Sequence, residues 1–402
     1  MNSTVLRKRL DELKNELIAK KLPDLSGELF LLFKETGNRI EYEKVYFERR
    51  RFLAVYGLSA CFFEKEKNSP AREMTFSEED RITLNEVLRN ILSEETWALP
   101  AHCNLSDPDW RHTVDLFACE TASALAVICD RASGFLDEDV KNGIVSEIGK
   151  RVICPMFLEG RKFGFECAAH NWNAVCMGSV GIVLLFMGER FLDEGSLNDA
   201  LKRVRKSLKV YIDKAFSDDG ASLEGLGYYN YGMSFFVAFA KRLYEKTGGK
   251  EDLFNDPKIE RIAAFPAKMY FKNGSSVNFS DAATDEKLHP GMMRHLFKHT
   301  EKCYDIPHDA YFSFDSDSCY RFVPLYDDVE NEISEGFGDT EETKLPESRM
   351  DHLEKAEWLI AESENSCGLA IKGGSNDEPH NHNDVGHFIY LAGNRFISAD
   401  LG

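Results

Sequence analysis

The residues best suited to chemistry lie close together in the polar stretch from Gly373 to Gly386. It places His380, His382 and Asp384 at every second position, and an apolar run stands on each side of it. A polar loop between two strand-like runs presents its side chains at one edge of a sheet, where binding groups often lie. Two histidines spaced by two residues point the same way in an extended segment. The alternative is a polar hairpin tip with solvated histidines, but the combined pattern favours a binding or catalytic site.

Composition bounds the class of protein. The chain has 402 residues, of which 43% are hydrophobic and 12% aromatic, so it is long and apolar enough to form a large core. The net charge of −19 argues against nucleic acid and anionic membrane surfaces as partners. Charged residues begin at Arg7, so the start lacks the apolar core of a signal peptide. The ten cysteines form no close pairs, which is typical of reduced thiols. We therefore expect a cytoplasmic protein, with no membrane partner and no organic cofactor.

Hydrophobic periodicity predicts a mainly α-helical chain over its first 325 residues. From residue 112 onward the predicted helices come in consecutive pairs, and antiparallel pairs stacked in sequence form a solenoid or a closed (α/α) toroid. The loops of a toroid collect at one end and line a cleft. The predicted helices are 4–20, 41–58, 82–92, 112–132, 137–157, 172–191, 197–216, 229–247 and 256–271.

Two loops between the predicted helices are rich in aromatic and polar side chains. Residues 163–172 and 218–231 both place aromatic, Asn, His or Glu side chains at the start of a helix. Aromatic side chains on such loops suit stacking against the faces of sugars. The alternative is that Trp172, Tyr229 and Tyr231 simply begin buried helices.

The pattern changes toward the C-terminus. Residues 326–350 are acidic and contain glycine and proline, which predicts a linker. Short apolar runs then predict strands at 358–361, 369–371, 388–391 and 396–399, with a two-residue hairpin at Gly393-Asn394. We therefore divide the chain into a toroid catalytic domain (1–325), an acidic linker (326–350) and the first part of an antiparallel β-sandwich (351–402). A sandwich needs more strands than these, so we expect a truncated form of a longer protein.

Three segments resemble those of one enzyme family. Residues 380–388 with 393–402 resemble the signature of the heparinase II/III-like polysaccharide lyases, which include alginate-type and heparin-type uronate lyases. Residues 171–176 resemble the family's Asn-Trp helix start, and residues 224–232 resemble its Glu-Gly-x-x-Tyr segment. The resemblance implies an (α/α) toroid followed by an antiparallel β-sandwich, with catalysis in the cleft between them. It also implies that the chain lacks most of the sandwich.

The activity implied by this resemblance is β-elimination on a uronic-acid glycan, catalysed by a carbon–oxygen lyase that forms a 4,5-unsaturated product. Removing the proton at C5 is difficult because a carboxylate stands beside it, so a hydrogen-bond donor must neutralise that carboxylate. By the resemblance, Asn171 is this donor, assisted by His170 or Asn173. Tyr228 is the acid and can also serve as the base, and His380 is the partner base or charge stabiliser. The implied substrate-binding residues are Trp172, Asn173, Glu224, Tyr229 and Tyr231, and the choice among Tyr228, Tyr229 and Tyr231 as catalytic tyrosine stays open.

The family's sandwich can also hold a divalent metal, often zinc. His382 and Asp400 match two of its ligand positions, which implies a structural zinc site near the cleft. A hairpin centred on Gly393-Asn394 pairs His387 with Asp400, so His387 either completes the site or forms an ion pair with Asp400.

Two other functions remain open at this point. A glycoside hydrolase on an (α/α) toroid would need two carboxylates about 5–10 Å apart, with Asp218, Asp219, Glu224 and Asp281 as candidates. A non-catalytic glycan-binding protein is the second alternative. The partner in each case is a uronate-containing oligosaccharide or another glycan, and neither the linkage nor the oligomeric state follows from the sequence.

Overall fold

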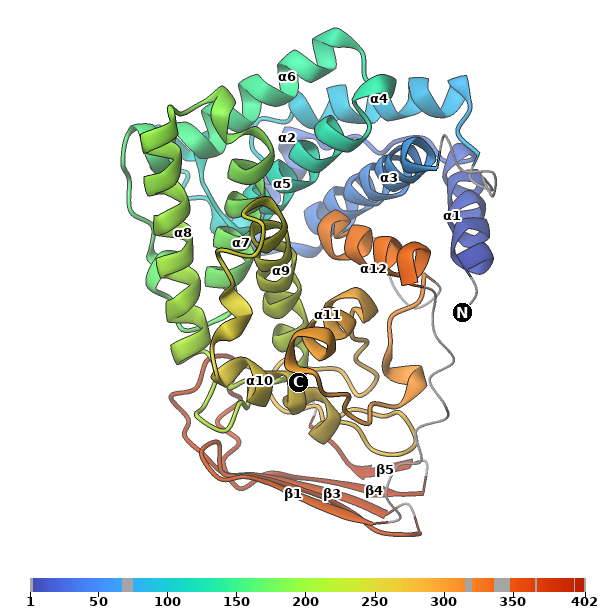
Figure 1. Ribbon diagram of the computed structural model, residues 1–402, viewed down its shortest axis with the longest axis vertical. Helices are drawn as coiled ribbons and strands as arrows, with labels where there is room; N and C mark the ends of the chain where they lie inside the picture. Colours follow the sequence, from blue (N-terminus) through green and yellow to red (C-terminus); the bar gives the residue numbers. More distant parts are fainter. Residues whose placement is uncertain are drawn as a thin grey trace. The chain divides into compact units, whose positions relative to one another are not determined.

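The computed structural model describes residues 3–66, 75–314, 320–335, 348–365, 367–393 and 395–400. Within these ranges the chain is helical up to residue 335 and then forms five antiparallel strands (Figure 1). This confirms the predicted order of a mainly helical part followed by an antiparallel sheet. The closed toroid and the sandwich stay predictions. The helices are α1 (Ser3–Ile18), α2 (Gly27–Thr36), α3 (Ile40–Lys65), α4 (Glu78–Leu92), α5 (Leu116–Arg131), α6 (Glu138–Ile148), α7 (Asn171–Met187), α8 (Glu194–Lys214), α9 (Gly225–Lys246), α10 (Lys258–Lys268), α11 (Pro290–Thr300) and α12 (Phe322–Glu335). The strands are β1 (Arg349–Leu353), β2 (Trp358–Glu362), β3 (Cys367–Lys372), β4 (Phe388–Ala392) and β5 (Arg395–Ser398).

The chain divides into two compact units, each built from several stretches of sequence. Unit 1 contains residues 1–163, 176–204 and 314–337. Its core is organised around α3, which packs against α1, α4, α5 and α12. Every residue of α3 from Phe52 to Phe62 is buried, so the helix is enclosed on all sides over this stretch.

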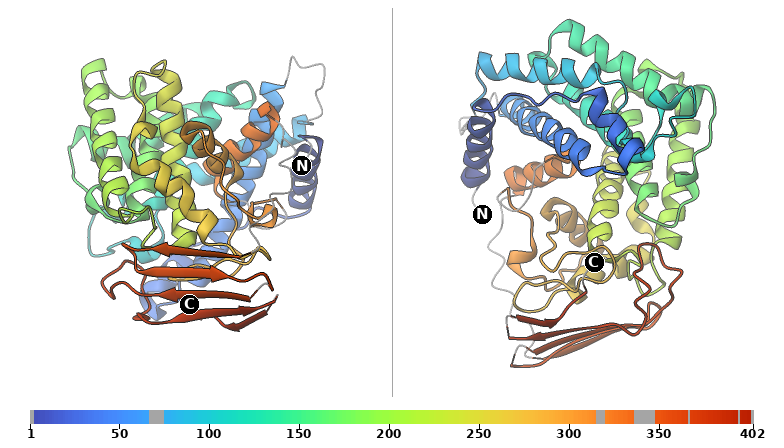
Figure 2. Two further views of the ribbon diagram at one scale, coloured as in Figure 1. Left: turned by 60° about the horizontal axis from the view of Figure 1, so that its bottom comes forward. Right: turned by 180° about the vertical axis from the view of Figure 1, so that it is seen from behind.

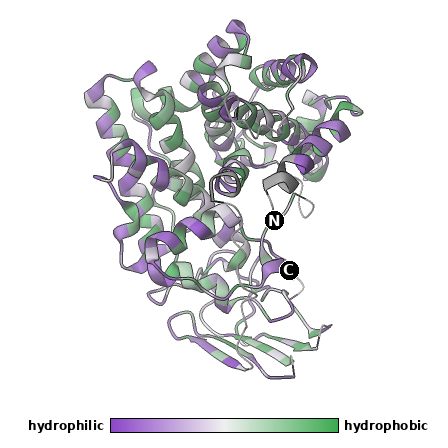
Figure 3. Ribbon diagram, turned by 45° about the vertical axis from the view of Figure 1, so that its right-hand side comes forward, coloured by the Kyte–Doolittle hydropathy of each residue, from purple (hydrophilic) through white to green (hydrophobic). Residues whose placement is uncertain are grey.

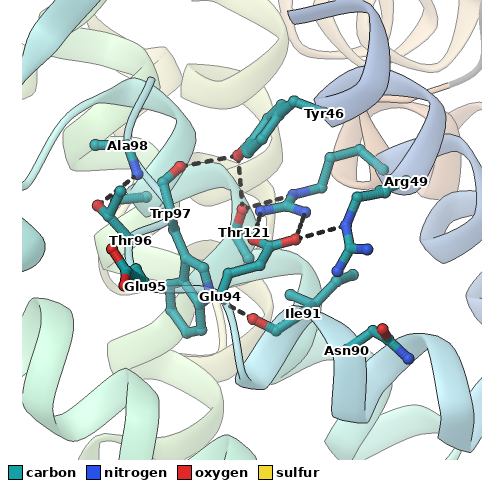
Figure 4. Close-up of polar contacts among 12 residues, drawn as sticks. Tyr46, Arg49, Asn90, Ile91, Glu94, Glu95, Thr96, Trp97, Ala98 and Thr121 are labelled. Carbon is teal, nitrogen blue, oxygen red and sulfur yellow. Dashed lines mark hydrogen bonds and ion pairs between the residues drawn. The ribbon is translucent and has the colours of Figure 1, made fainter. Parts of the chain in front are cut away.

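A group of buried charges lies in unit 1, and we call Arg49, Arg50 and Glu94 the arginine cluster (Figure 4). Oε1 of Glu94 accepts hydrogen bonds from Arg49 Nε at 2.9 Å and from Arg50 Nη1 at 3.0 Å. Its Oε2 accepts one from Arg50 Nη2 at 2.7 Å, and Arg50 Nε donates to the hydroxyl of Thr121 at 3.1 Å. Both oxygens of the buried carboxylate are therefore paired with cationic donors.

Unit 2 contains residues 164–175, 205–313 and 338–402. Helix α11 packs against α9 and α10, and the strands lie in the order β1-β2-β3-β4-β5, each antiparallel to its neighbour (Figure 2). Inward side chains alternate with outward ones along each strand, and hydrophobic residues occur among hydrophilic ones there (Figure 3). On the inner face the Trp358 ring contacts Phe265 and Phe279. Gly368 lies so close to Phe271 that an added Cβ would come within 2.5 Å of that ring.

Several elements differ from the sequence-based expectations. Helices α2, α11 and α12 and strand β1 were not predicted, and α12 makes the first ten residues of the expected linker helical. Of the rest of that linker, 336–347 lies outside the described residues, as does Asn394 of the hairpin. The expected pairing of His387 with Asp400 is wrong. A bulge between Tyr390 and Leu391 shifts the β4–β5 register, so that Tyr390 pairs with Ser398.

One helical stretch is apolar enough to be compared with a membrane span. Residues 171–190 have the length and hydropathy of such a segment, but 89% of its most apolar window is buried inside the structure. This burial is typical of a core helix of a globular fold.

Candidate functional site

Most of the predicted site residues come together within unit 2. Asn171 is the first residue of α7, Glu224 immediately precedes α9, and Tyr228 lies in the first turn of α9. His380 and His382 lie in the loop between β3 and β4, which we call the histidine loop (residues 373–387). Residues 278–281, which lie outside the three family-like motifs, also contact these site residues.

Asn171 and Glu224 form a buried pair, exposed by 1% and 2% respectively. The Asn171 backbone N–H donates to Glu224 Oε2 at 2.6 Å, and its side-chain Nδ2 donates to Oε1 at 2.7 Å. Glu224 thus satisfies a backbone N–H that the start of α7 would leave unpaired. Burial raises the pKa of Glu224 to about 7, because its partners are neutral amides, which lower the pKa by less than burial raises it.

His380 lies against Tyr228, with their ring centres 4.0 Å apart and the planes 27° from parallel. Nδ1 of His380 lies 2.7 Å from Asp281 Oδ2, and its Nε2 lies 3.4 Å from Glu224 Oε1. His170 is near enough that burial and the charge of His380 together lower its pKa. An imidazole, a phenol, a carboxylic acid and an amide therefore face the same small region, and three of these groups can transfer protons.

Three residues at the site have a backbone conformation that side chains other than glycine rarely adopt. Ser280, His380 and Asn383 have φ of +59°, +56° and +54°. This left-handed conformation costs of order 1 kcal/mol or more for such residues, and it persists where the surroundings hold it. The strain falls on the residue next to Asp281 and on the histidine loop itself, which is where strained backbone at a functional site is expected.

A second group of ligand-type atoms lies beside the first. One ligand atom from each of His382, Asp384 and Asp400 falls within 4.8 Å of the others. His382 Nδ1 lies 3.3 Å from Asp400 Oδ1, which matches the predicted pairing of these two residues. Oδ2 of Asp384 is buried and has no hydrogen-bond partner among the described residues, while Oδ1 accepts from Lys372 Nζ at 2.8 Å. One imidazole and two carboxylates, with one carboxylate oxygen left open, fit the donor set of a zinc site.

Some predicted substrate-binding residues belong to the core instead. Tyr229 is 0% exposed and its ring packs against Phe216 and Phe265, so it belongs to the core. Asn173 is also fully buried, and its amide donates to the backbone carbonyls of Glu166 and Ala168 and accepts from Ser207. It fixes the turn before α7. The other two predicted aromatic residues, Trp172 and Tyr231, are half-buried.

Asp281 was considered from the sequence only as a hydrolase carboxylate. In the structure its Oδ1 lies 3.0 Å from His382 Nε2, while its Oδ2 bonds to His380, so one carboxylate contacts both histidines. Burial alone would raise the pKa of Asp281, but the hydrogen bonds from His382 and His380 outweigh it and lower the pKa. The available sequence signal was only a polar Ser-Asp pair directly after Val277-Asn278-Phe279.

Comparison with known proteins gives matches only among solved structures. No protein-family model matches the chain, and neither does any curated protein sequence. Among solved structures, the chain is similar to a heparinase III with methylated lysines. That match has 12% sequence identity and a TM-score of 0.45, and it covers 93% of this chain and 64% of the other. The chain also spans less than two thirds of the matched structure.

Proposed function

We propose that the chain is a lyase that cleaves uronic-acid-containing oligosaccharides or polysaccharides by β-elimination. The observation that carries this proposal is the stacking of Tyr228 on His380 next to the Asn171–Glu224 pair. These groups supply a phenolic acid, an imidazole base and an amide donor within one small region. β-Elimination beside a carboxylate needs all three.

The proposed reaction assigns one proton to each of two residues. His380 accepts the proton from C5, the electrons of that bond form the C4–C5 double bond, and the C4–O4 bond breaks. Tyr228 donates its phenolic proton to the departing O4. One Nδ2 hydrogen of Asn171 is bonded to Glu224, and the second is the donor proposed for the substrate carboxylate.

Glu224 supports this reaction through its hydrogen bonds with Asn171 and because it is only partly ionised near neutral pH. A uronate substrate is anionic, and a permanently ionised carboxylate beside Asn171 would repel it. Because its pKa is raised to about 7, Glu224 carries a proton in much of the population near neutral pH. It can therefore orient the Asn171 amide with less repulsion of a negative ligand.

A zinc ion would be held by His382, Asp384 and Asp400. Bound there, it would supply a structural link between the histidine loop and the segment that follows β5. The proton transfers assigned above do not involve it.

The activity test uses a panel of alginate, heparan, chondroitin and hyaluronan oligosaccharides. Product formation is followed by the ultraviolet absorbance of the 4,5-unsaturated uronate, and Tyr228→Phe should abolish it. Tyr244→Phe is the matched control, an exposed tyrosine near the C-terminal end of α9. New reducing ends without absorbance would instead indicate a hydrolase. Binding without turnover, with an unchanged Kd in Tyr228→Phe, would indicate a glycan-binding protein.

A further inference from the structure

The segment 278–281 contacts three parts of the site. Asn278 Nδ2 donates to the backbone carbonyl of Asp400 at 2.9 Å, and Asp281 bonds to both histidines of the histidine loop. The same segment packs against the start of α9, the helix that carries Tyr228. The segment therefore contacts Asp400, the histidine loop and the start of α9 at once, and it can fix the distances between these three parts of the site.

The contact with α9 is between backbones and leaves little freedom. A Cβ on Gly225, whose φ is +83°, would come within 2.5 Å of the carbonyl oxygen of Phe279. A Cβ on Gly227 would lie 3.2 Å from the carbonyl oxygen of Asp281. The two glycines that flank Leu226 thus let the segment approach the helix directly. Asp281 is thereby held at a fixed place relative to Glu224 and Tyr228.

We propose that Asp281 is a positioning residue that orients both loop histidines and selects the tautomer of His380. With the Asp281 carboxylate accepting from Nδ1–H of His380, the lone pair of the neutral ring lies on Nε2. Nε2 is the nitrogen that faces Glu224. A second bond, from His382 Nε2 to the other carboxylate oxygen, fixes the carboxylate itself.

This inference rests on the proposed function, because it assigns which ring nitrogen of His380, the proposed base, carries the lone pair. It assigns Asp281 no proton transfer. A loss of Asp281 should therefore act through His380 and reduce turnover more than substrate binding. A histidine without this carboxylate would turn about its side-chain bonds and populate both tautomers.

The kinetic test is a double-mutant cycle. Asp281→Ala should lower kcat about a hundredfold with less than a threefold change in KM, whereas Asp285→Ala, an exposed carboxylate four residues later, should leave both unchanged. In a His380→Ala background, Asp281→Ala should cost less than a further threefold in kcat. A full hundredfold loss in that background would show that Asp281 acts independently of His380 and would overturn the proposal. If Asp281→Ala does not fold, Asp281→Asn is used in the same cycle.

A spectroscopic test does not depend on turnover. With ¹⁵N-labelled histidine, the ring signals missing from His380→Ala identify His380. In the parent these signals should report protonation at Nδ1, and in Asp281→Ala they should shift toward protonation at Nε2. Unchanged signals would overturn the inference even if the protein proves to be a lyase. Conversely, a shift of the signals in a protein that turns over no glycan would leave the positioning role standing and refute the proposed function.

Discussion

Two groups of charged residues in this molecule contrast sharply. In the arginine cluster of unit 1, the three charged side chains are exposed by only 3–8% and are paired with one another. The Glu94 carboxylate has cationic partners on both oxygens. In unit 2, burial raises the pKa of the equally buried Glu224, and the hydrogen bonds from its neutral amide partners lower that pKa by less. His380 and His382 nearby have side chains exposed by 30% and 22%. Removing one member of a fully paired buried set of charges destabilises the fold, whereas titratable groups with few charged partners can still exchange protons.

The largest effect expected from this contrast is on turnover in unit 2. His380→Ala should lower kcat at least a thousandfold, about 4 kcal/mol in barrier, because it removes the proposed base. Its melting temperature should stay close to that of the parent, since the ring is partly exposed. The control is His352→Ala, an exposed histidine on β1. A large loss of stability with turnover preserved would assign His380 to the fold instead.

The reverse behaviour is expected of the arginine cluster. Glu94→Gln leaves two buried guanidinium groups without their carboxylate, which should lower the free energy of unfolding by about 3 kcal/mol. Urea denaturation measures this loss, and kcat of the folded fraction should not change. Glu95→Gln, at the exposed neighbouring position, should stay within about 0.5 kcal/mol of the parent. An equal effect of both substitutions would contradict the structural role of the cluster.

The pH dependence of stability distinguishes the two glutamates further. The pKa of Glu224 is about 7 in the folded protein, against an ordinary value of 4.5 for a solvated glutamate, so folding favours its protonated form. The stability from this group is complete below pH 4.5 and is lost as the pH rises through 7, by roughly 3 kcal/mol in total. Glu224→Gln should flatten the unfolding free energy over this window, and exposed Glu354→Gln should not. Parallel pH curves for parent and Glu224→Gln would rule out a raised pKa.

The smallest expected effect concerns His382. Hydrogen bonding to Asp281 raises the pKa of His382, so its stabilising contribution is present below pH 6.5 and fades as the pH rises above that value. His382→Ala should lower stability by about 1 kcal/mol at pH 6. If zinc is bound, a chelator should lower the melting temperature of the parent but not that of His382→Ala. A parent protein whose melting ignores the chelator would leave the ion pair with Asp400 as the whole role of His382.

The sequence predicted the parts of this molecule that local patterns encode. Periodicity predicted most of the helices and four of the five strands, and short motifs identified Asn171, Glu224, Tyr228 and His380, which the fold brings together. The roles of these residues stay predictions. Asp281 could not be assigned in the same way, because its position depends on the left-handed backbone before it and on a contact 99 residues away in sequence.

Other misses have equally physical causes. Tyr229 looked like its neighbours in the motif, but its place on α9 turns it into the core. The register of the last hairpin could not be counted from its turn, because a bulge adds a residue to one strand. Helix α12 was hidden because its acidic residues resemble a linker, although Asp327 and Asp328 are buried. Local composition cannot reveal such burial.

The ion pair between Lys372 and Asp384 determines how the histidine loop can move. Lys372 is fully buried at the end of β3, and the loop's backbone also bonds to it through Gly386 and His387. Separating such a pair costs about 3–5 kcal/mol, so roughly one molecule in a few hundred to a few thousand has the loop open at any moment. Its motion should therefore follow the slow local unfolding of the sheet edge rather than the nanosecond fluctuations of a free loop. Amide hydrogen exchange at Gly386, whose N–H donates to the carbonyl of Lys372, should accordingly be as slow as in β3, and any ligand would meet the loop as a fixed rim.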